Sequence, residues 1–299
     1  MKLYFSGSLT RSSYRQIEQL IKYNGYRLCT YAYPNETYVY LDIADELGYK
    51  ANMMIDSGAF TAFTKGKPVQ LPKLLAYSKR LIEKYGDRHD FVFIGLDIIP
   101  PKNPTETDLK KGMKQSYENF LVQQQELAPY PVLPVYHSSE PVSLRNLYLK
   151  HTDHIALSMN QAMAEKHRVD WATRVQVPDV KMHGLAATGV QMIRYVDWYS
   201  VDSAAWIMIA AMGGVYWPTE DGNISLLPIS AQSPKVKRRN THAMNFTMTN
   251  EIKDTIESKN YKVEDLMYDY SSRMSWNLDV WVNHPWVRTP LFQQGLFSD

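Results

Sequence analysis

The segment FVFIGLDII, residues 91–99, is a nearly continuous run of apolar side chains, many of them aromatic or β-branched. A strand of this kind has both faces covered, which is typical of a parallel sheet packed between helices. The segment HIALSM, residues 154–159, has the same character. These two runs therefore favour an α/β fold built on a parallel sheet.

Short β-rich runs recur along the chain with helical segments between them, as expected of parallel strands joined by crossover helices. Eight strands predict a closed (β/α)8 TIM-type barrel. An open doubly wound sheet is the alternative, because hydrophobic spacing does not distinguish a closed sheet from an open one. The eight runs cover residues 3–6, 26–31, 53–56, 91–97, 132–137, 154–158, 180–185 and 198–204.

Helical spacing is clearest in LPKLLAYSKRLIEKYG, residues 71–86, and in residues 108–128, where apolar side chains recur every three or four positions. Gly86 stands where a helix C-terminal glycine belongs. Two weaker helices, at residues 38–47 and 190–196, are predicted partly because a barrel requires them.

The length of 299 residues and the hydrophobic content of 44% predict one barrel domain over residues 1–299. The barrel strands are expected within about residues 1–213, and a C-terminal loop and helices within 214–299. Residues 213–240 look less regular, whereas 249–258 and 263–282 have helical patterns. The tail either completes the outer ring of helices or forms a lid.

Composition limits the class of protein. Cys29 is the only cysteine, so we expect a buried thiol, with neither a disulfide nor a Cys/His zinc site. No stretch approaches the roughly 20 apolar residues that span a bilayer, and no N-terminal apolar segment resembles a signal peptide. We therefore predict a soluble cytoplasmic protein without membrane contact.

The net charge of +2 is too small to indicate nucleic-acid binding by itself. One basic run lies in a loop flanked by Ser and Pro, where its side chains could reach phosphates. A solvated loop explains the same run equally well. The run consists of Lys235, Lys237, Arg238 and Arg239.

Three acids stand where predicted strands end: Asp56, Asp97 and Asp202. In a barrel the reactive residues collect at the C-terminal ends of the strands and in the loops after them. Any one of these carboxylates could instead cap the following helix. Helix capping alone does not readily explain three carboxylates at one rim. We therefore expect the three side chains to share a cavity.

Other residues at the same rim are candidates for binding a planar ring. Ser57 and Gly58 permit a sharp turn and a close approach of ligand to backbone, and Gly184 offers the same on the seventh strand. Tyr136 and His137 could stack on a ring or hydrogen-bond to it, although packing is an equal alternative. Metal ligation by His137 and His183 lacks supporting spacing.

Three motifs, in order, resemble the tRNA-guanine transglycosylase superfamily. MIDSGAF at residues 54–60 resembles the family's D-S-G-G-F segment, GLA at 184–186 its G-L-A segment, and VDS at 201–203 the late segment with the nucleophilic aspartate. The resemblance covers roughly residues 50–210. It implies a (β/α)8 barrel that replaces guanine in a nucleic acid with a 7-deazaguanine, without a cofactor.

Carried over residue by residue, the resemblance implies that Asp202 is the nucleophile and Asp56 the general acid/base or its assistant. Asp97 would bind the ring N–H and exocyclic amine of guanine. Backbone groups of Gly184 and Leu185 would contact the base. The remaining base-binding candidates are Ser57 and Gly58 on strand three, and Tyr136 or His137, which occupies the place of a base-contacting glutamine.

The tRNA enzymes carry a Cys-rich zinc site after the eighth strand, and residues 213–240 contain no cysteine. The chain thus more closely resembles the short zinc-free relatives of phages and bacteria that insert 7-deazaguanines into DNA. The implied partners are DNA, duplex or locally opened, and a free 7-deazaguanine base, with no metal. If the chain is encoded by a phage, the host cytoplasm is the expected location. The oligomeric state stays open.

The chemistry suits carboxylates, because displacing a base at C1′ builds oxocarbenium character that an aspartate can capture covalently. Three alternatives remain: the same exchange on tRNA, a barrel glycosidase or deoxyribosyl hydrolase, and a noncatalytic nucleic-acid-binding barrel.

Overall fold

The computed structural model describes residues 1–23, 25–99, 105–160, 162–219, 222–230 and 248–287. Its main sheet has the order β5-β4-β3-β2-β1-β9-β8-β7-β6, and all neighbouring strands in it are parallel. The strands are β1 (Lys2–Phe5), β2 (Tyr26–Thr30), β3 (Asn52–Asp56), β4 (Asp90–Ile94), β5 (Val132–Leu133), β6 (Val135–His137), β7 (His154–Ser158), β8 (Lys181–Gly184) and β9 (Ser200–Ser203).

The two ends of this sheet, β5 and β6, are consecutive in the chain and separated only by Pro134. The Leu133 carbonyl accepts a hydrogen bond from the N–H of Gly95 on the β4 side (2.7 Å), and the Pro134 carbonyl accepts one from the N–H of Ala156 on β7 (2.9 Å). Proline has no N–H to donate, which interrupts the ladder here. The predicted fifth strand thus closes the sheet in two pieces, and the α/β TIM-type barrel is confirmed.

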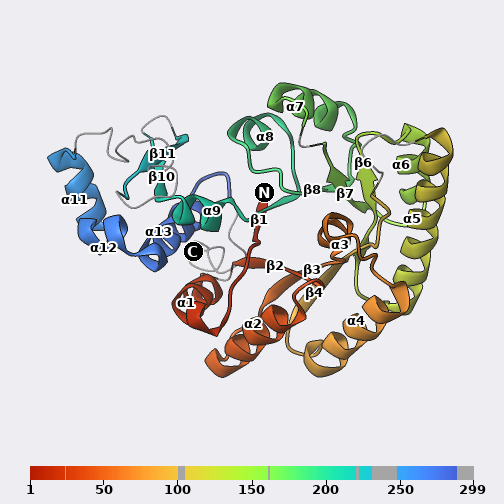
Figure 1. Ribbon diagram of the computed structural model, residues 1–299, viewed down its shortest axis with the longest axis horizontal. Coiled ribbons are helices and arrows are strands. Elements are labelled where there is room, and N and C mark those ends of the chain that lie inside the picture. Colours follow the sequence, from red (N-terminus) through yellow and green to blue (C-terminus); the bar gives the residue numbers. More distant parts are fainter. Residues whose placement is uncertain (24, 100–104, 161, 220–221, 231–247, 288–299) are drawn as a thin grey trace, which may run out of the picture.

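Helices follow the barrel strands and surround them (Figure 1). In the described parts of the chain, none is long and apolar enough to cross a membrane. Around the barrel they are α1 (Tyr14–Lys22), α2 (Pro34–Leu47), α3 (Ala59–Lys65), α4 (Leu71–Tyr85), α5 (Glu106–Glu126), α6 (Val142–Tyr148), α7 (Glu165–Arg174), α8 (Val190–Tyr195) and α9 (Ala205–Ala211), with a short 3-10 turn, η1 (Arg11–Ser13), before α1.

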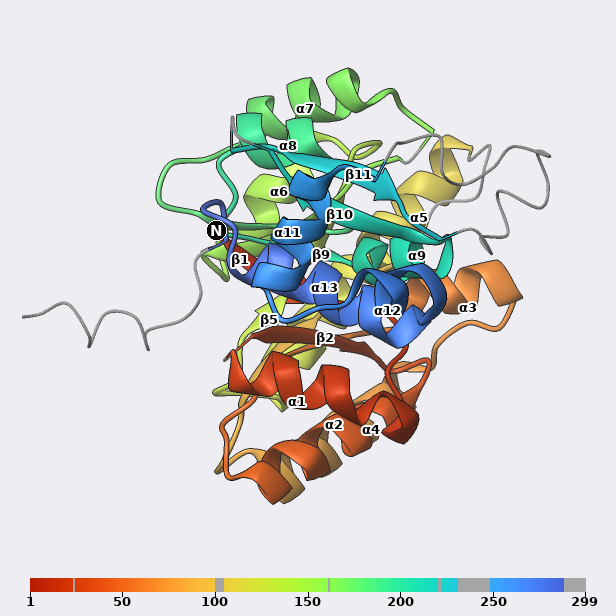
Figure 2. The ribbon, with the colours of Figure 1, turned by 90° about the vertical axis from the view of Figure 1, so that its left-hand side faces the viewer.

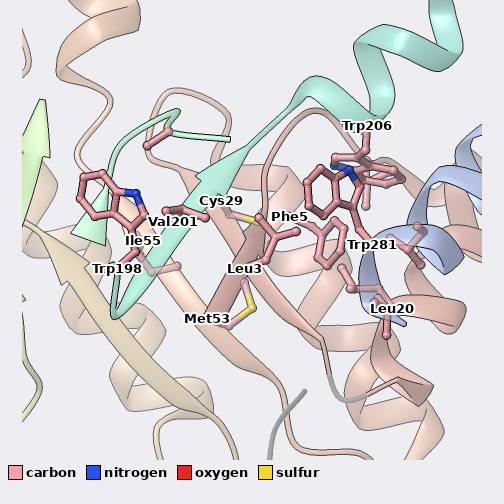
Figure 3. Packing of buried hydrophobic residues seen from close by; sticks show 14 of the residues in the cluster. Leu3, Phe5, Leu20, Cys29, Met53, Ile55, Trp198, Val201, Trp206 and Trp281 are labelled. Carbon is pink, nitrogen blue, oxygen red and sulfur yellow. The ribbon is translucent and has the colours of Figure 1, made fainter. Parts of the chain in front are cut away.

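Side-chain alternation along the strands divides the core into two parts. Outward-facing residues pack under the helices, and Figure 3 shows Phe5 of β1 next to Trp206 of α9, with ring centroids 5.7 Å apart. Cys29 belongs to this layer and is a buried free thiol, as predicted. Inward-facing residues fill the barrel: Tyr4, Tyr26, Leu28, Met54, Ile94, Leu133, Val135 and Ala156.

The C-terminal third differs in part from expectation. Residues 213–240 were expected to be irregular, but they contain an antiparallel hairpin of β10 (Gly214–Pro218) and β11 (Ile224–Pro228). The five residues between these strands, 219–223, include an Asp-Gly dipeptide of the kind that marks a hairpin in sequence, so the sequence carries a hairpin signal that the prediction overlooked. The helices α11 (Asn250–Ser258), α12 (Val263–Tyr268) and α13 (Tyr270–Val282) agree with the predicted helical patterns.

Helix α13 packs beside α1, α9 and β10, so it belongs to the outer layer and not to a lid. The amide of Gln16 on α1 donates to the Ser275 hydroxyl at 2.9 Å, and the amide of Asn277 donates to the Trp206 carbonyl at 2.9 Å. Side chains therefore bond this helix to both the first and the last βα unit.

Gly86 follows α4 as predicted, but for a different physical reason. Its backbone is right-handed (φ −67°), so no left-handed conformation requires glycine. A Cβ atom here would lie 2.3 Å from the Tyr130 hydroxyl and 2.6 Å from the Ile82 carbonyl oxygen. Space, not conformation, excludes a side chain.

We expect Gly86→Ala to lower the free energy of unfolding by about 1–3 kcal/mol, the usual cost of forcing atoms into a packed site. Gly112→Ala is the matched control, because a Cβ there meets Ile98 at an ordinary 3.5 Å. That change should add about 0.5–1 kcal/mol, since alanine favours helix more than glycine does. Urea denaturation measures both, and equal effects of the two variants would contradict the steric explanation.

Candidate active site

A cavity of about 460 Å³ opens at the C-terminal ends of the barrel strands. Its lining includes Asp56, Asp97 and Asp202, which come from three separate strands or the loops after them. Helix α3 contributes Ala59, Phe60 and Thr61. Figure 2 shows α3 at the end of the barrel opposite the N-terminus. The three carboxyl groups predicted to converge therefore do share one cavity.

Strand register determines which residues face this cavity. Asp202 on β9 pairs with Tyr4 on β1, and Tyr4 is part of the barrel interior. Its neighbour Val201 points the other way, into the layer under the helices. The interior residue Leu28 also lines the cavity, so the top of the barrel core forms its floor.

Asp202 is buried and held by donors on both carboxylate oxygens. The Ser6 hydroxyl donates to Oδ2 at 3.1 Å, and the Ala186 backbone N–H donates to Oδ1 at 2.8 Å. Nε2 of the fully buried His183 lies 3.6 Å from Oδ1, and its Nδ1 lies 2.9 Å from the Ser200 hydroxyl. Donors aimed at both oxygens of a carboxylate hold its orientation.

The loop that carries Ser6 is itself fixed by buried donors. Arg27 donates from Nη1 to the Phe5 carbonyl at 2.7 Å and from Nη2 to the Gly7 carbonyl at 2.5 Å. The indole N–H of Trp206 donates to the Ser6 carbonyl at 2.9 Å. These bonds position the Ser6 hydroxyl toward Asp202.

Asp56 has a different environment from Asp202. Burial is the main cause that raises the pKa of its carboxyl group to about 6, and the charges of Asp97 and Asp202 raise it further. Hydrogen bonds from the Thr30 hydroxyl and from the Gly58 N–H, the latter 2.9 Å from Oδ2, oppose this shift. A carboxyl group with a pKa near neutrality can both give and take a proton.

Asp97 is paired with a histidine inside the cavity. Its Oδ2 lies 2.8 Å from Nε2 of His137, and both side chains are about nine-tenths buried. Burial alone lowers the His137 pKa, but the hydrogen bond and charge of Asp97, with the charge of Glu140, outweigh it and raise that pKa. Glu140 also accepts from the His137 backbone N–H at 2.7 Å.

The structure separates the two residues proposed for the place of the glutamine. His137 lines the cavity, whereas Tyr136 is on the opposite face of β6. The Tyr136 ring stacks on Trp171 with centroids 5.7 Å apart, and its hydroxyl donates to the Glu140 carbonyl at 3.0 Å. The prediction that Tyr136 contacts the base is therefore wrong. Neighbouring residues of a strand point to opposite faces, so only His137 faces the cavity.

The predicted glycine and serine contacts also need correction. Gly184 faces the helices: a Cβ there would lie 2.6 Å from the Ala187 Cβ and 3.0 Å from the Trp198 ring, so the glycine makes room for protein. Leu185, next to it, does line the cavity. Ser57 is buried, and its hydroxyl faces the Ala59 N–H at 3.4 Å. Neither Ser57 nor Gly184 is part of the cavity lining.

Gly58 forms the turn after β3 and holds the Asp56 carboxylate in position. Its φ of +77° is left-handed, and its N–H holds Asp56. The predicted sharp turn is therefore present, but Gly58 lies at a neighbouring groove and not in the cavity lining. The basic run of Lys235, Lys237, Arg238 and Arg239 lies outside the described residues.

Sequence reasoning missed several residues of the site. Ser6 could have been found by applying the strand-end rule to the first strand, whose run ends in Ser-Gly-Ser. Glu36, which lines the cavity and accepts from Ser8 at 2.6 Å, lies near the start of a helix and has no distinguishing pattern. Glu140 lies in a loop and gave no signal either.

In the described parts of the chain, no group of three or more His, Cys, Asp or Glu side chains is arranged to hold a metal ion. No protein-family model matches the chain, and a search of curated proteins finds no match.

The raised pKa of Asp56 predicts a pH-dependent stability difference for Asp56→Asn. The native state binds this proton more tightly than the unfolded chain, so the wild type loses stability as pH rises from about 4 to about 6. We expect the variant to match the wild type below pH 4. Above pH 6 it should be more stable, by on the order of 3 kcal/mol, since the pKa of the Asp56 carboxyl group is raised from 3.8 to about 6. Urea titrations from pH 3.5 to 8 measure this, and a constant difference would contradict the shift.

Proposed function

We propose that the protein exchanges guanine in a nucleic acid, most directly DNA, for a 7-deazaguanine base through a covalent aspartyl-sugar intermediate. The observation that carries the proposal is the convergence of Asp56, Asp97 and Asp202 on one cavity in three different environments. Pairs of carboxyl groups with contrasting environments are how enzymes assign separate acid, base and nucleophile roles.

Asp202 suits the role of nucleophile. The donors from Ser6 and Ala186 hold its carboxylate in a fixed orientation at the cavity wall. In the first step a carboxylate oxygen bonds to C1′ while the bond from C1′ to the guanine nitrogen breaks. The departing base takes its proton from Asp56, whose pKa of about 6 leaves a protonated fraction near neutrality.

The second step reverses the same events with another base. The ring nitrogen of the incoming 7-deazaguanine bonds to C1′, the ester to Asp202 breaks, and Asp56 takes the proton that this nitrogen loses. Both carboxyl groups return to their initial states. A carbon at position 7 prevents protonation there, so the new glycosidic bond is harder to cleave and exchange runs toward product.

Asp97 and His137 suit recognition of the purine. A carboxylate is an acceptor only, and guanine presents adjacent ring N–H and amine donors that such a group accepts in pairs. The volume of about 460 Å³ is within the range of small-molecule pockets, roughly 300–1,000 Å³. In a duplex the nucleotide must leave the stack to reach it, which costs a few kcal/mol.

The decisive test is incorporation of a radiolabelled 7-deazaguanine into guanine-containing DNA. We expect Asp202→Asn to lower the rate about 10³-fold or more, because the amide cannot form the ester. Asp197→Asn, an exposed acid before the same strand, is the control and should retain activity. Incorporation into tRNA but not into DNA would show that tRNA is the substrate. Release of guanine without incorporation would indicate a hydrolase. Activity that survives Asp202→Asn would refute the nucleophile.

Base recognition can be tested separately with DNA that contains hypoxanthine, which lacks the exocyclic amine. We expect the wild type to prefer guanine and Asp97→Asn to lose about tenfold of that preference in kcat/KM, since one acceptor oxygen is lost. Tyr136→Phe should retain the preference, because that hydroxyl bonds to the Glu140 carbonyl on the outer face of β6. If Asp97→Asn kept the preference for guanine and Tyr136→Phe lost it, Asp97 would not be a base-binding residue.

A further inference from the structure

A second depression, of about 350 Å³, adjoins the catalytic cavity. It lies between α3, the loop after it and the start of α4, and it shares Thr61 with the catalytic cavity. Its lining includes three exposed lysines: Lys65, Lys67 and Lys73. We call this feature the lysine groove.

The three lysines are available to an anion. None of them forms an ion pair with a carboxylate in the part of the chain that the structure describes. The ammonium group of Lys65 donates to the Tyr33 hydroxyl at 3.2 Å and lies 5.0 Å from the centre of the Tyr33 ring. Tyr33 lines the catalytic cavity, so Lys65 lies between the two features.

The catalytic cavity has the opposite charge. Asp56, Asp97, Asp202 and Glu36 all line it, with His137 as the one facing histidine in its described lining. Such a cavity stabilises a cationic sugar and accepts from a donor-rich base, but it repels phosphate. A nucleotide that places its base and sugar in this cavity must keep its phosphates outside it. Because these phosphates are bonded to the sugar, they must lie just beyond the rim.

Aromatic side chains stand at the same rim. Phe60 on α3 and Tyr33 line the catalytic cavity and are 67% and 46% exposed, and Phe63, three positions after Phe60 on the same helix, is 48% exposed. Sites for single-stranded nucleic acid combine such stacking surfaces with a cationic track along the backbone. The rim of the cavity and the lysine groove together have this composition.

We propose that the lysine groove binds the phosphodiester next to the target nucleotide, so that the substrate is recognised as a polynucleotide strand with its target base turned into the acidic cavity. The inference rests on the proposed function and adds a phosphate subsite to it. It also locates backbone contacts on α3, the loop after it and the start of α4, at residues that the basic run at 235–239 does not include.

Binding tests the groove without requiring catalysis. The Asp202→Asn protein is titrated with a fluorescent guanine-containing single-stranded DNA 20-mer at several salt concentrations. In that background, changing Lys65, Lys67 and Lys73 to Gln should weaken binding about tenfold or more near 0.1 M salt. The slope of log affinity against log salt should become shallower by about 0.7, because one phosphate contact to a single strand contributes about that much.

The matched control changes Lys50, Lys150 and Lys181 to Gln, which removes the same charge. These lysines lie just before or at the start of β3, β7 and β8, at the opposite end of the barrel. Binding by the control should stay within about twofold of its parent, and thermal unfolding checks that both triple variants are folded. Equal weakening by both variants, or no change of salt slope in the groove variant, would overturn the proposal.

Exchange kinetics separate this proposal from the proposed function. In otherwise wild-type protein, the groove variant should raise KM for the DNA strand about tenfold while kcat changes little, because the lysines do not contact the reacting atoms. Exchange by the wild type with an unchanged KM in the groove variant would refute the groove alone. Absence of exchange by the wild type would refute the proposed function, and the binding result would still decide the groove.

Discussion

The pairing of β1 with β9 is the constraint on which the site depends. Tyr4 lies opposite Asp202, and this register joins the two ends of the barrel sequence at the place where the carboxylate faces inward. Because side chains alternate along a strand, a slip of one residue would turn Asp202 under the helices and bring Val201 into the cavity. The outward packing of Val201 and Phe5 opposes such a slip, since both would lose buried contacts.

Closure of the sheet turns that local constraint into a shared cavity. Asp56, Asp97 and Asp202 are up to 146 positions apart in the chain, yet a closed ring of parallel strands brings their ends to one mouth. Around the mouth the charge changes sign over a short distance, from a carboxylate-lined interior to the lysine groove on α3. This arrangement matches a nucleotide, whose reacting sugar becomes cationic while its phosphate stays anionic.

The barrel could be predicted from the sequence because strands buried on both faces leave long apolar runs, as in residues 91–99. The convergence of the acids followed from the strand-end rule. Which of two adjacent residues faces the cavity did not follow, because it depends on register: His137 faces in and Tyr136 out. Contacts that cross the sheet, such as Ser6 to Asp202, depend on closure and leave no local pattern.

Helix α13 is connected to Asp202 through a relay of hydrogen bonds. Asn277 holds the Trp206 carbonyl, the Trp206 indole holds the Ser6 carbonyl, and the Ser6 hydroxyl holds Asp202. A fragment that keeps Asp202 in this position therefore has to extend beyond the last barrel strand and include α13. Changes in this remote helix would shift the Asp202 carboxylate without touching the cavity, so the contact of α13 with α9 helps to set the geometry of the site.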